Sequence, residues 1–174
     1  MKRLTKDEYF LAMAGMAALR ATCDRARVGC VIVKDGEVIS TGYNGAAPGL
    51  AECDAVGHLL VLGDDGRHHC KRTIHAEANA LYQAKAKCRN LAGATAYVSA
   101  TSCEVCMAEM LKWGIKRVVF GSVYKNVDNA PLRKRMLEAW SAVADYRPAP
   151  EITLVFDENV EEHKNVEIVR IPSK

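Results

Sequence analysis

The sequence has no long apolar run and little excess charge of either sign. None of its hydrophobic stretches approaches the roughly 20 residues that a membrane-spanning helix needs. Its 24 lysines and arginines face 21 aspartates and glutamates, so it lacks the basic surplus that favours nucleic-acid binding. Aromatic residues make up only 6% of the chain, which argues against a base-stacking surface. We therefore expect neither a membrane partner nor a nucleic-acid partner.

The start of the chain also lacks a hydrophobic leader. Its first eight residues, MKRLTKDE, turn acidic where a signal peptide would become apolar. The seven cysteines form an odd number, and without a leader they are more typical of metal ligands or buried thiols than of a disulfide framework. We therefore predict a cytoplasmic protein.

The 174 residues show no internal repeat and no low-complexity tail. This length suits one domain with a sizeable core, which we expect to span residues 1–174. Residues 50–72 show neither helical nor strand periodicity, although they contain several cysteines and histidines. A segment of this kind is usually functional or disordered, and we predict that it is a metal-binding insert.

Local patterns predict an α/β protein. A capping box at Thr5–Glu8 begins a helix that reaches Arg20. Two β-branched runs, 28–33 and 37–43, flank an Asp-Gly pair typical of a tight hairpin. Further helices are predicted at 75–89, 106–113 and 132–143, and further strands at 94–100, 116–121, 152–156 and 166–171. The helix–strand–helix–strand order over 75–121 implies adjacent parallel strands.

The strongest chemical signal is a histidine–glutamate pair followed by two cysteines. His75 and Glu77 open the helix predicted at 75–89, and Cys103 and Cys106 stand at the start of the next helix. The first of these helices would rise roughly 21 Å, and the strand after it would span roughly 22 Å. The chain should therefore return to the helix start and bring the cysteines beside His75.

One histidine and two cysteines match the ligand set of a catalytic zinc site. Such a site keeps three protein ligands and one position for water, whose pKa the metal lowers to roughly 7. Helix N-termini also favour thiolates. Glu77 would stay off the metal and carry protons. The alternatives are a pair of reduced core cysteines or a structural zinc, which would need a fourth protein ligand.

These two motifs resemble the signature of zinc-dependent nucleotide deaminases. Four stretches are similar to deoxycytidylate (dCMP) deaminases in particular, namely Val28–Gly29, Ser40–Gly45, Arg72–Glu77 and Gly114–Lys116. The resemblance covers residues 10–125. It implies a three-layer α/β/α sandwich with a central mixed sheet of about five strands. It also implies a homo-oligomer, often a hexamer.

The resemblance implies hydrolysis of dCMP to dUMP and ammonia, which would supply dUMP for thymidylate synthesis. Water activated by zinc would attack C4 of cytosine, and Glu77 would protonate N3 and then the departing amino group. Many members are activated by dCTP and inhibited by dTTP, and Mg²⁺ would accompany a triphosphate effector. The alternatives are a deaminase of another cytosine nucleotide or of nucleic acid, and a non-enzymatic zinc-stapled module with this fold.

Substrate contacts follow from the same resemblance. Asn44 and the backbone at Ala76 and Ser102 are expected to touch the substrate, although Asn44 in an Asn-Gly pair is also typical of a turn. Ser102 stands where the family has proline, so the backbone there is freer and serine can cap the following helix. The phosphate candidates, chosen on position and charge, are Arg27, Tyr124 and Lys125. The effector-site candidates are Gly42, Tyr43 and Gly45.

A second, structural zinc is also implied, because phage members of the family hold one with cysteine and histidine. Cys23 and Cys53 stand at matching places, and His58, His69 and Cys70 are candidates to complete the site. A metal would also order an insert with little apolar periodicity. The alternative is a set of buried free thiols with solvent-exposed histidines.

Overall fold

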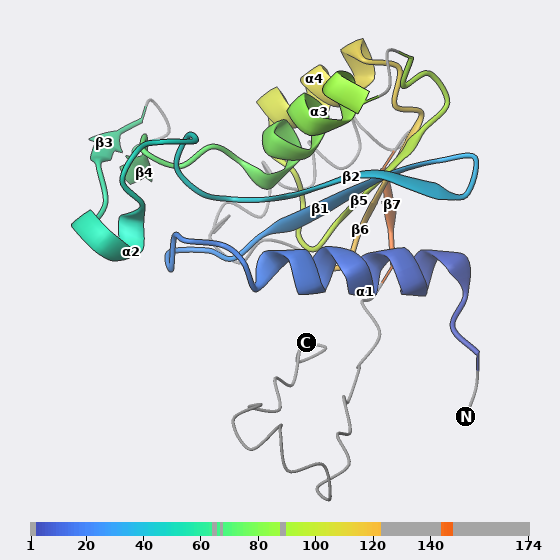
Figure 1. The fold of residues 1–174 in the computed structure, drawn as a ribbon, viewed down its shortest axis with the longest axis horizontal. Helices are drawn as coiled ribbons and strands as arrows, with labels where there is room; N and C mark the ends of the chain where they lie inside the picture. The colour runs from blue at the N-terminus through green and yellow to red at the C-terminus, as the bar shows by residue number, and fades with distance from the viewer. Residues whose placement is uncertain (1–2, 64–65, 67, 88–89, 123–143, 148–174) are drawn as a thin grey trace, which may run out of the picture.

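The computed structural model describes residues 3–63, 66, 68–87, 90–122 and 144–147 (Figure 1). Its helices are α1 (Lys6–Ala18), α2 (Cys53–Val56), α3 (Ala76–Lys87) and α4 (Glu104–Lys112). Its strands are β1 (Gly29–Lys34), β2 (Glu37–Tyr43), β3 (Leu60–Leu62), β4 (His68–Cys70), β5 (Thr95–Val98), β6 (Arg117–Phe120) and β7 (Ala144–Tyr146). The helix predicted at 132–143 and the strands predicted at 152–156 and 166–171 lie outside the described residues. Among the described helices, none is long and apolar enough to cross a membrane.

A mixed five-stranded sheet with the order β2-β1-β5-β6-β7 forms the centre of the molecule. Strand β1 pairs antiparallel with β2 and β5, whereas β6 pairs parallel with β5 and β7. Helix α1 covers one face of the sheet, and α3 and α4 cover the other (Figure 1). The predicted three-layer α/β/α sandwich is therefore confirmed.

Side chains of β1 alternate between the two faces of the sheet, as strand geometry requires. Cys30 and Ile32 belong to the core under α3 and α4. Val31 and Val33 pack with α1 on the opposite face. Cys30 is fully buried, so it is the small core residue that its place within a strand predicts.

Two local signals in the sequence produce the structures expected of them. Thr5 caps α1 by accepting a hydrogen bond from the Glu8 amide, and the Glu8 carboxylate accepts one from the Thr5 amide at 2.7 Å. Asp35 and Gly36 both have positive φ, 54° and 84°, as a two-residue hairpin turn requires. The predicted capping box and hairpin are confirmed.

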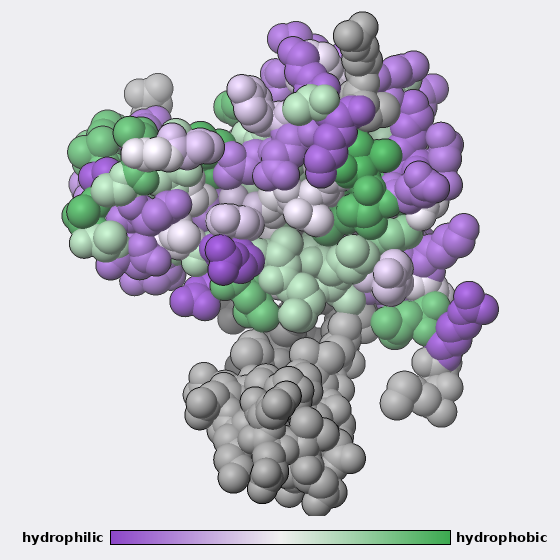
Figure 2. Space-filling model, viewed as in Figure 1, coloured by the Kyte–Doolittle hydropathy of each residue, from purple (hydrophilic) through white to green (hydrophobic). Residues whose placement is uncertain are grey.

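The predicted insert forms a small lobe beside the main sheet, built from α2 and the two-stranded β3–β4 sheet (Figure 1). Green patches on this lobe in Figure 2 mark hydrophobic residues at its surface. Its exposed apolar side chains are Leu50, Val56, Leu59, Leu60, Val61 and Leu62. A lobe that leaves so much apolar surface in water needs another source of order.

Two glycines let the helices lie directly on the sheet. A Cβ at Gly29 would meet the Ala14 carbonyl oxygen of α1 at 2.0 Å. On the opposite face, a Cβ at Gly42 would lie 2.3 Å from the Ala76 carbonyl oxygen of α3. No side chain fits at either distance, so both positions require glycine for close packing.

Arg117, at the start of β6, binds aspartates from two distant parts of the chain. Its guanidinium donates to both carboxylate oxygens of Asp7 in α1, at 2.8 and 2.9 Å, and to Asp145 in β7. The Tyr97 hydroxyl also donates to Asp7, at 2.9 Å. Arg117 lowers the pKa of both carboxyls. This network ties α1 to β5, β6 and β7.

We expect Asp7→Asn to lower the free energy of unfolding by about 1–2 kcal/mol at pH 7, because it removes a bidentate but partly exposed ion pair. A carboxyl with a lowered folded-state pKa stabilises the fold above its unfolded pKa, and that contribution disappears as the pH falls below about 4. Urea unfolding at pH 7 and pH 3 would measure the difference, with exposed Asp35→Asn as the control. An equal loss at both pH values would contradict the assignment.

Candidate metal centre and active site

His75, Cys103 and Cys106 come together where two helices begin. His75 directly precedes α3, Cys103 is the N-cap of α4, and Cys106 lies in the first turn of α4. The Nδ1 atom of His75 lies 3.5 Å from the Cys103 sulfur and 3.4 Å from the Cys106 sulfur. The predicted ligands of the catalytic zinc are thus brought into one cluster.

These distances suit a tetrahedral zinc ion. Zinc lies about 2.3 Å from a cysteine sulfur and about 2.1 Å from a histidine nitrogen, so tetrahedral geometry separates nitrogen and sulfur by about 3.5 Å. Both nitrogen–sulfur distances in the cluster agree with this value. Among the described residues, the cluster offers three ligand atoms, which is the number that a catalytic site keeps.

Several hydrogen bonds hold the start of α3 beside the end of β2. Gly45 and Ile74 exchange backbone hydrogen bonds at 3.2 and 2.8 Å, immediately before His75. The Asn79 amide donates to the Tyr43 carbonyl oxygen, and the Ser40 hydroxyl donates to the Ala80 carbonyl oxygen. The sequence predicted that the chain would return to this point, although α3 begins one residue later than predicted and β5 is shorter than the predicted 94–100.

The two cysteines of the cluster differ in acidity. Hydrogen bonding from the Cys106 thiol, and further from His75, lowers the pKa of Cys103 to about 4. The pKa of Cys106 is raised because it lies beside the Cys103 sulfur. The hydrogen bond to Cys103 also raises the pKa of His75. A divalent cation would offset the repulsion that opposes ionisation of both thiols, so the electrostatics favour a bound metal.

Glu77 lies one residue into α3 and is buried, with 4% of its surface exposed. It is not one of the clustered ligand residues. Burial raises the pKa of its carboxyl, and its own backbone amide and His75 oppose that rise. A carboxyl with a raised pKa that is not needed as a ligand is suited to take up and release a proton.

Asn44 is buried and braces the loop before β1. Its Oδ1 accepts a hydrogen bond from the Val28 amide at 2.7 Å, and its Nδ2 donates to the Ala26 carbonyl oxygen at 2.8 Å. These two groups flank Arg27, which is exposed. Asn44 therefore fixes the backbone on both sides of Arg27, which is predicted to bind the substrate phosphate. A direct contact between Asn44 and the substrate stays a prediction.

The other predicted binding residues fall into different environments. Ala76 and Ser102 are buried beside the cluster. Gly42 lies under α3, where it packs against backbone and leaves no space for a ligand on that side. Tyr43 is half-buried, with the Arg20 guanidinium 5.9 Å from its ring centre. The effector role of Gly42, Tyr43 and Gly45 stays a prediction, and Tyr124 and Lys125 lie outside the described residues.

Ser102 does not cap α4. The N-cap is Cys103, which makes no side-chain capping hydrogen bond. The Ser102 hydroxyl oxygen is buried and makes no hydrogen bond with any described residue. The expectation that this serine caps the helix is therefore wrong, because the helix begins one residue later.

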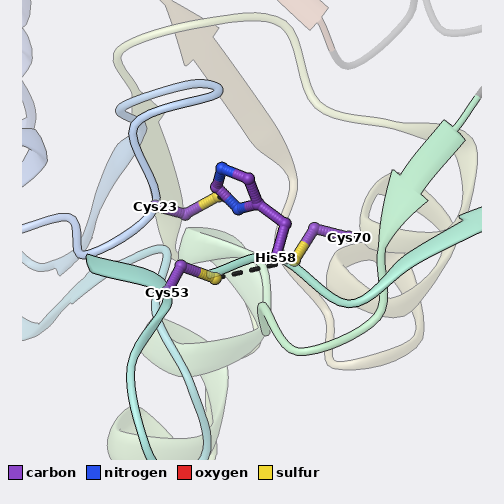
Figure 3. Close-up of side chains that lie close together, drawn as sticks. All are labelled: Cys23, Cys53, His58 and Cys70. Atoms are coloured by element: carbon purple, nitrogen blue, oxygen red, sulfur yellow. Dashed lines mark hydrogen bonds between the residues drawn. The ribbon is translucent and has the colours of Figure 1, made fainter. Parts of the chain in front are cut away.

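A second cluster joins the insert to the loop after α1 (Figure 3). It contains Cys23, Cys53, His58 and Cys70, and their ligand atoms lie within 4.8 Å of one another. The Cys53 and Cys70 sulfurs are 3.6 Å apart, and the Cys23 sulfur is 3.8 Å from Nδ1 of His58. Such distances suit the edges of a tetrahedral zinc site, about 3.5 to 3.8 Å long.

His69 is not part of this cluster. It lies between His68 and Cys70 in β4, and neighbouring residues of a strand point to opposite faces. Cys70 therefore faces the cluster while His69 faces away, and its side chain is exposed. Of the five residues predicted for a second metal, the structure gathers the other four.

Asp24 is a member of the second site that the sequence reasoning missed. Its carboxylate lies 2.9 Å from Nε2 of His58, which leaves Nδ1 directed at the cysteines. A carboxylate commonly orients a metal-binding histidine in this way. The feature of the sequence that could have indicated this role is the position of Asp24 directly after Cys23.

Comparisons with known proteins agree with this geometry. Residues 4–122 match the family model of the cytidine and deoxycytidylate deaminase zinc-binding region. The chain is 42% identical to a deoxycytidylate deaminase of Mycobacterium phage D29 over 127 residues, covering 69% of this chain and 97% of the phage protein. It is 40% identical to ComE operon protein 2 of Bacillus subtilis (strain 168) over 125 residues, covering 72% of this chain and 64% of that protein.

The chain also resembles a yeast enzyme in sequence and a phage enzyme in structure. The chain is 37% identical over 126 residues to the deoxycytidylate deaminase of Saccharomyces cerevisiae, covering 72% of this chain but only 40% of that enzyme. The chain thus spans well under two thirds of the yeast protein. A crystal structure of dCMP deaminase from cyanophage S-TIM5 covers 84% of this chain and 100% of its own, with a TM-score of 0.65 and 21% identity. That likeness supports the fold.

We expect Cys106→Ser to bind one zinc ion fewer per chain than the wild type, because it removes one of three ligands. Cys30→Ala is the matched control, since Cys30 is also buried but belongs to the hydrophobic core and not to the cluster. Metal analysis after dialysis would measure both variants. A Cys106→Ser protein that retains the full wild-type zinc content would show that the cluster is not a metal site.

Proposed function

Because the chain belongs to the cytidine and deoxycytidylate deaminase family, we propose that it catalyses the zinc-dependent hydrolysis of dCMP to dUMP and ammonia. The observation that carries this proposal is the buried Glu77 carboxyl next to a cluster of one histidine and two cysteines. A structural zinc site has four protein ligands and needs no such carboxyl. The combination supports hydrolytic chemistry at a metal.

The metal would be held by His75, Cys103 and Cys106, and would supply an activated water molecule and Lewis-acid chemistry. Glu77 would take one proton from the water molecule whose oxygen bonds to C4 of cytosine, and would pass that proton to N3. It would then take the proton of the new C4 hydroxyl and pass it to the amino group, so that the C4–N bond breaks and ammonia leaves. The buried position of Glu77 keeps bulk water from competing for these protons. The products are dUMP and ammonia.

The surroundings of the cluster support a small anionic substrate. Arg27 is exposed on a loop that Asn44 fixes through two hydrogen bonds, so a phosphate could bind without a large rearrangement of the backbone. Arginine suits phosphate because its guanidinium donates two parallel hydrogen bonds. A role in supplying dUMP for thymidylate synthesis follows from the product. A homo-oligomer and a cytoplasmic location stay predictions, as do dCTP and dTTP as effectors and Mg²⁺ with them.

Ammonia release from the purified protein would test the substrate. The protein would be incubated in parallel with dCMP, dCTP, deoxycytidine and a cytosine-containing oligonucleotide. We expect turnover of dCMP well above the other three. Turnover of the oligonucleotide alone would overturn the proposal, and a zinc-loaded protein that turns over none of them would favour a non-enzymatic module.

We expect Glu77→Gln to keep the zinc content of the wild type and to lose activity by at least about 10²-fold, because the amide cannot carry a proton. The matched control is Glu109→Gln, in which the changed carboxylate accepts a hydrogen bond from Trp113 on the outer part of α4. Metal analysis and initial rates with dCMP measure both properties. Loss of zinc in Glu77→Gln would mean that the carboxyl is a ligand.

We propose a second, structural zinc held by Cys23, Cys53, His58 and Cys70. Four protein ligands leave no position for water, which is typical of a structural zinc. Burial raises the pKa of Cys53 to about 11, whereas hydrogen bonds from Thr73 and nearby groups overcome the effect of burial at Cys70 and lower its pKa to about 6. A metal would therefore displace at least the Cys53 proton on binding.

Wild-type protein is accordingly expected to bind two zinc ions per chain, and Cys53→Ser one. Removing this ligand should also lower the melting temperature by several degrees, because metal binding contributes to the stability of the insert. His69→Ala is the control, since it lies beside the cluster without joining it. A wild-type content near one zinc per chain would refute the second site.

A further inference from the structure

Ser102 is unusual among the hydroxyl residues of the described chain. It is 8% exposed, and its oxygen is the one buried side-chain polar atom among the described residues that makes no hydrogen bond. The hydroxyls of Ser40, Ser99 and Ser122 all have partners within the protein. A buried hydroxyl without a partner destabilises a fold, so its presence calls for a partner that is not part of the chain.

The place of Ser102 indicates which atoms that partner would bring. Ser102 directly precedes Cys103, whose sulfur lies 3.5 Å from Nδ1 of His75, and Glu77 stands two residues after that histidine. Under the proposed function, Glu77 delivers its protons to N3 and to the amino group on C4 of the base. A buried hydroxyl directly before Cys103 is therefore available to the same edge of the cytosine ring.

We propose that Ser102 is a further catalytic residue, whose hydroxyl oxygen accepts a hydrogen bond from the C4 amino group as this group leaves. This inference rests on the proposed function. The hydroxyl transfers no proton, since Glu77 supplies the proton that converts the amino group into ammonia. Ser102 instead holds the departing nitrogen, whose positive charge grows when Glu77 protonates it. An oxygen acceptor binds that group more strongly in the transition state than in the ground state.

If Ser102 has this role, replacing it should change the stability and the activity of the protein in opposite directions. Ser102→Ala removes an unpaired buried hydroxyl, so the melting temperature should stay equal to that of the wild type or rise. The same change removes the acceptor, so kcat for dCMP should fall about tenfold while KM changes less than about twofold. A residue that only supports the fold would lose stability and activity together.

The experiment compares the wild type, Ser102→Ala and Ser122→Ala, all loaded with zinc. Ser122 is the matched control because its hydroxyl donates to the Ser99 carbonyl oxygen at 2.9 Å, so its removal should lower stability and leave kcat nearly unchanged. Melting temperature, zinc content, kcat and KM would be measured for each. Lower kcat with unchanged KM and undiminished stability in Ser102→Ala supports the inference.

Two outcomes overturn it while leaving the proposed function intact. A Ser102→Ala protein with wild-type kcat would show that the hydroxyl does not contact the reacting group. A parallel loss of melting temperature and kcat would show a structural role. A zinc-loaded wild type that does not turn over dCMP would instead overturn the proposed function, and this inference with it.

Discussion

The close approach of α3 to β2 sets the geometry on which the whole site depends. A Cβ at Gly42 would lie 2.3 Å from the Ala76 carbonyl oxygen, so the helix can rest on the strand only because this position is glycine. The bridge between Gly45 and Ile74 then aligns the residues that lead into the helix. Backbone packing therefore places His75 and Glu77 beside the end of β2.

Strand order brings the second half of the site to the same place. Strand β5 lies next to β1 in the centre of the sheet, and its end leads directly into α4. The N-termini of α3 and α4 consequently meet beside each other, and both helix dipoles present their positive ends to the Cys103 and Cys106 sulfurs. Helix dipoles favour thiolates there, but two adjacent thiolates still repel. A divalent metal would offset this repulsion.

The sequence predicted the cluster of His75, Cys103 and Cys106 well, because regular helices and strands carry these residues. Matched helix and strand lengths sufficed to place Cys103 near His75. The structure of the insert was harder to predict, because a segment without periodicity does not show which of its side chains face inward. Whether His69 or Cys70 faces the second cluster depends on the alternation of one short strand, which only the pairing of β3 with β4 fixes. The capping role expected of Ser102 failed for a similar reason, since a shift of one residue at a helix start changes which side chain is the cap.

One short segment connects the two clusters. Cys70 belongs to the second cluster, and His75 follows it by five residues. Between them, Thr73 contacts the Cys53 sulfur at 3.5 Å and Ile74 pairs with Gly45. The short segment from Cys70 to His75 is thus held at both ends and in its middle. The loop that presents His75 is therefore held by contacts both with the insert, through Thr73, and with the end of β2, through Ile74.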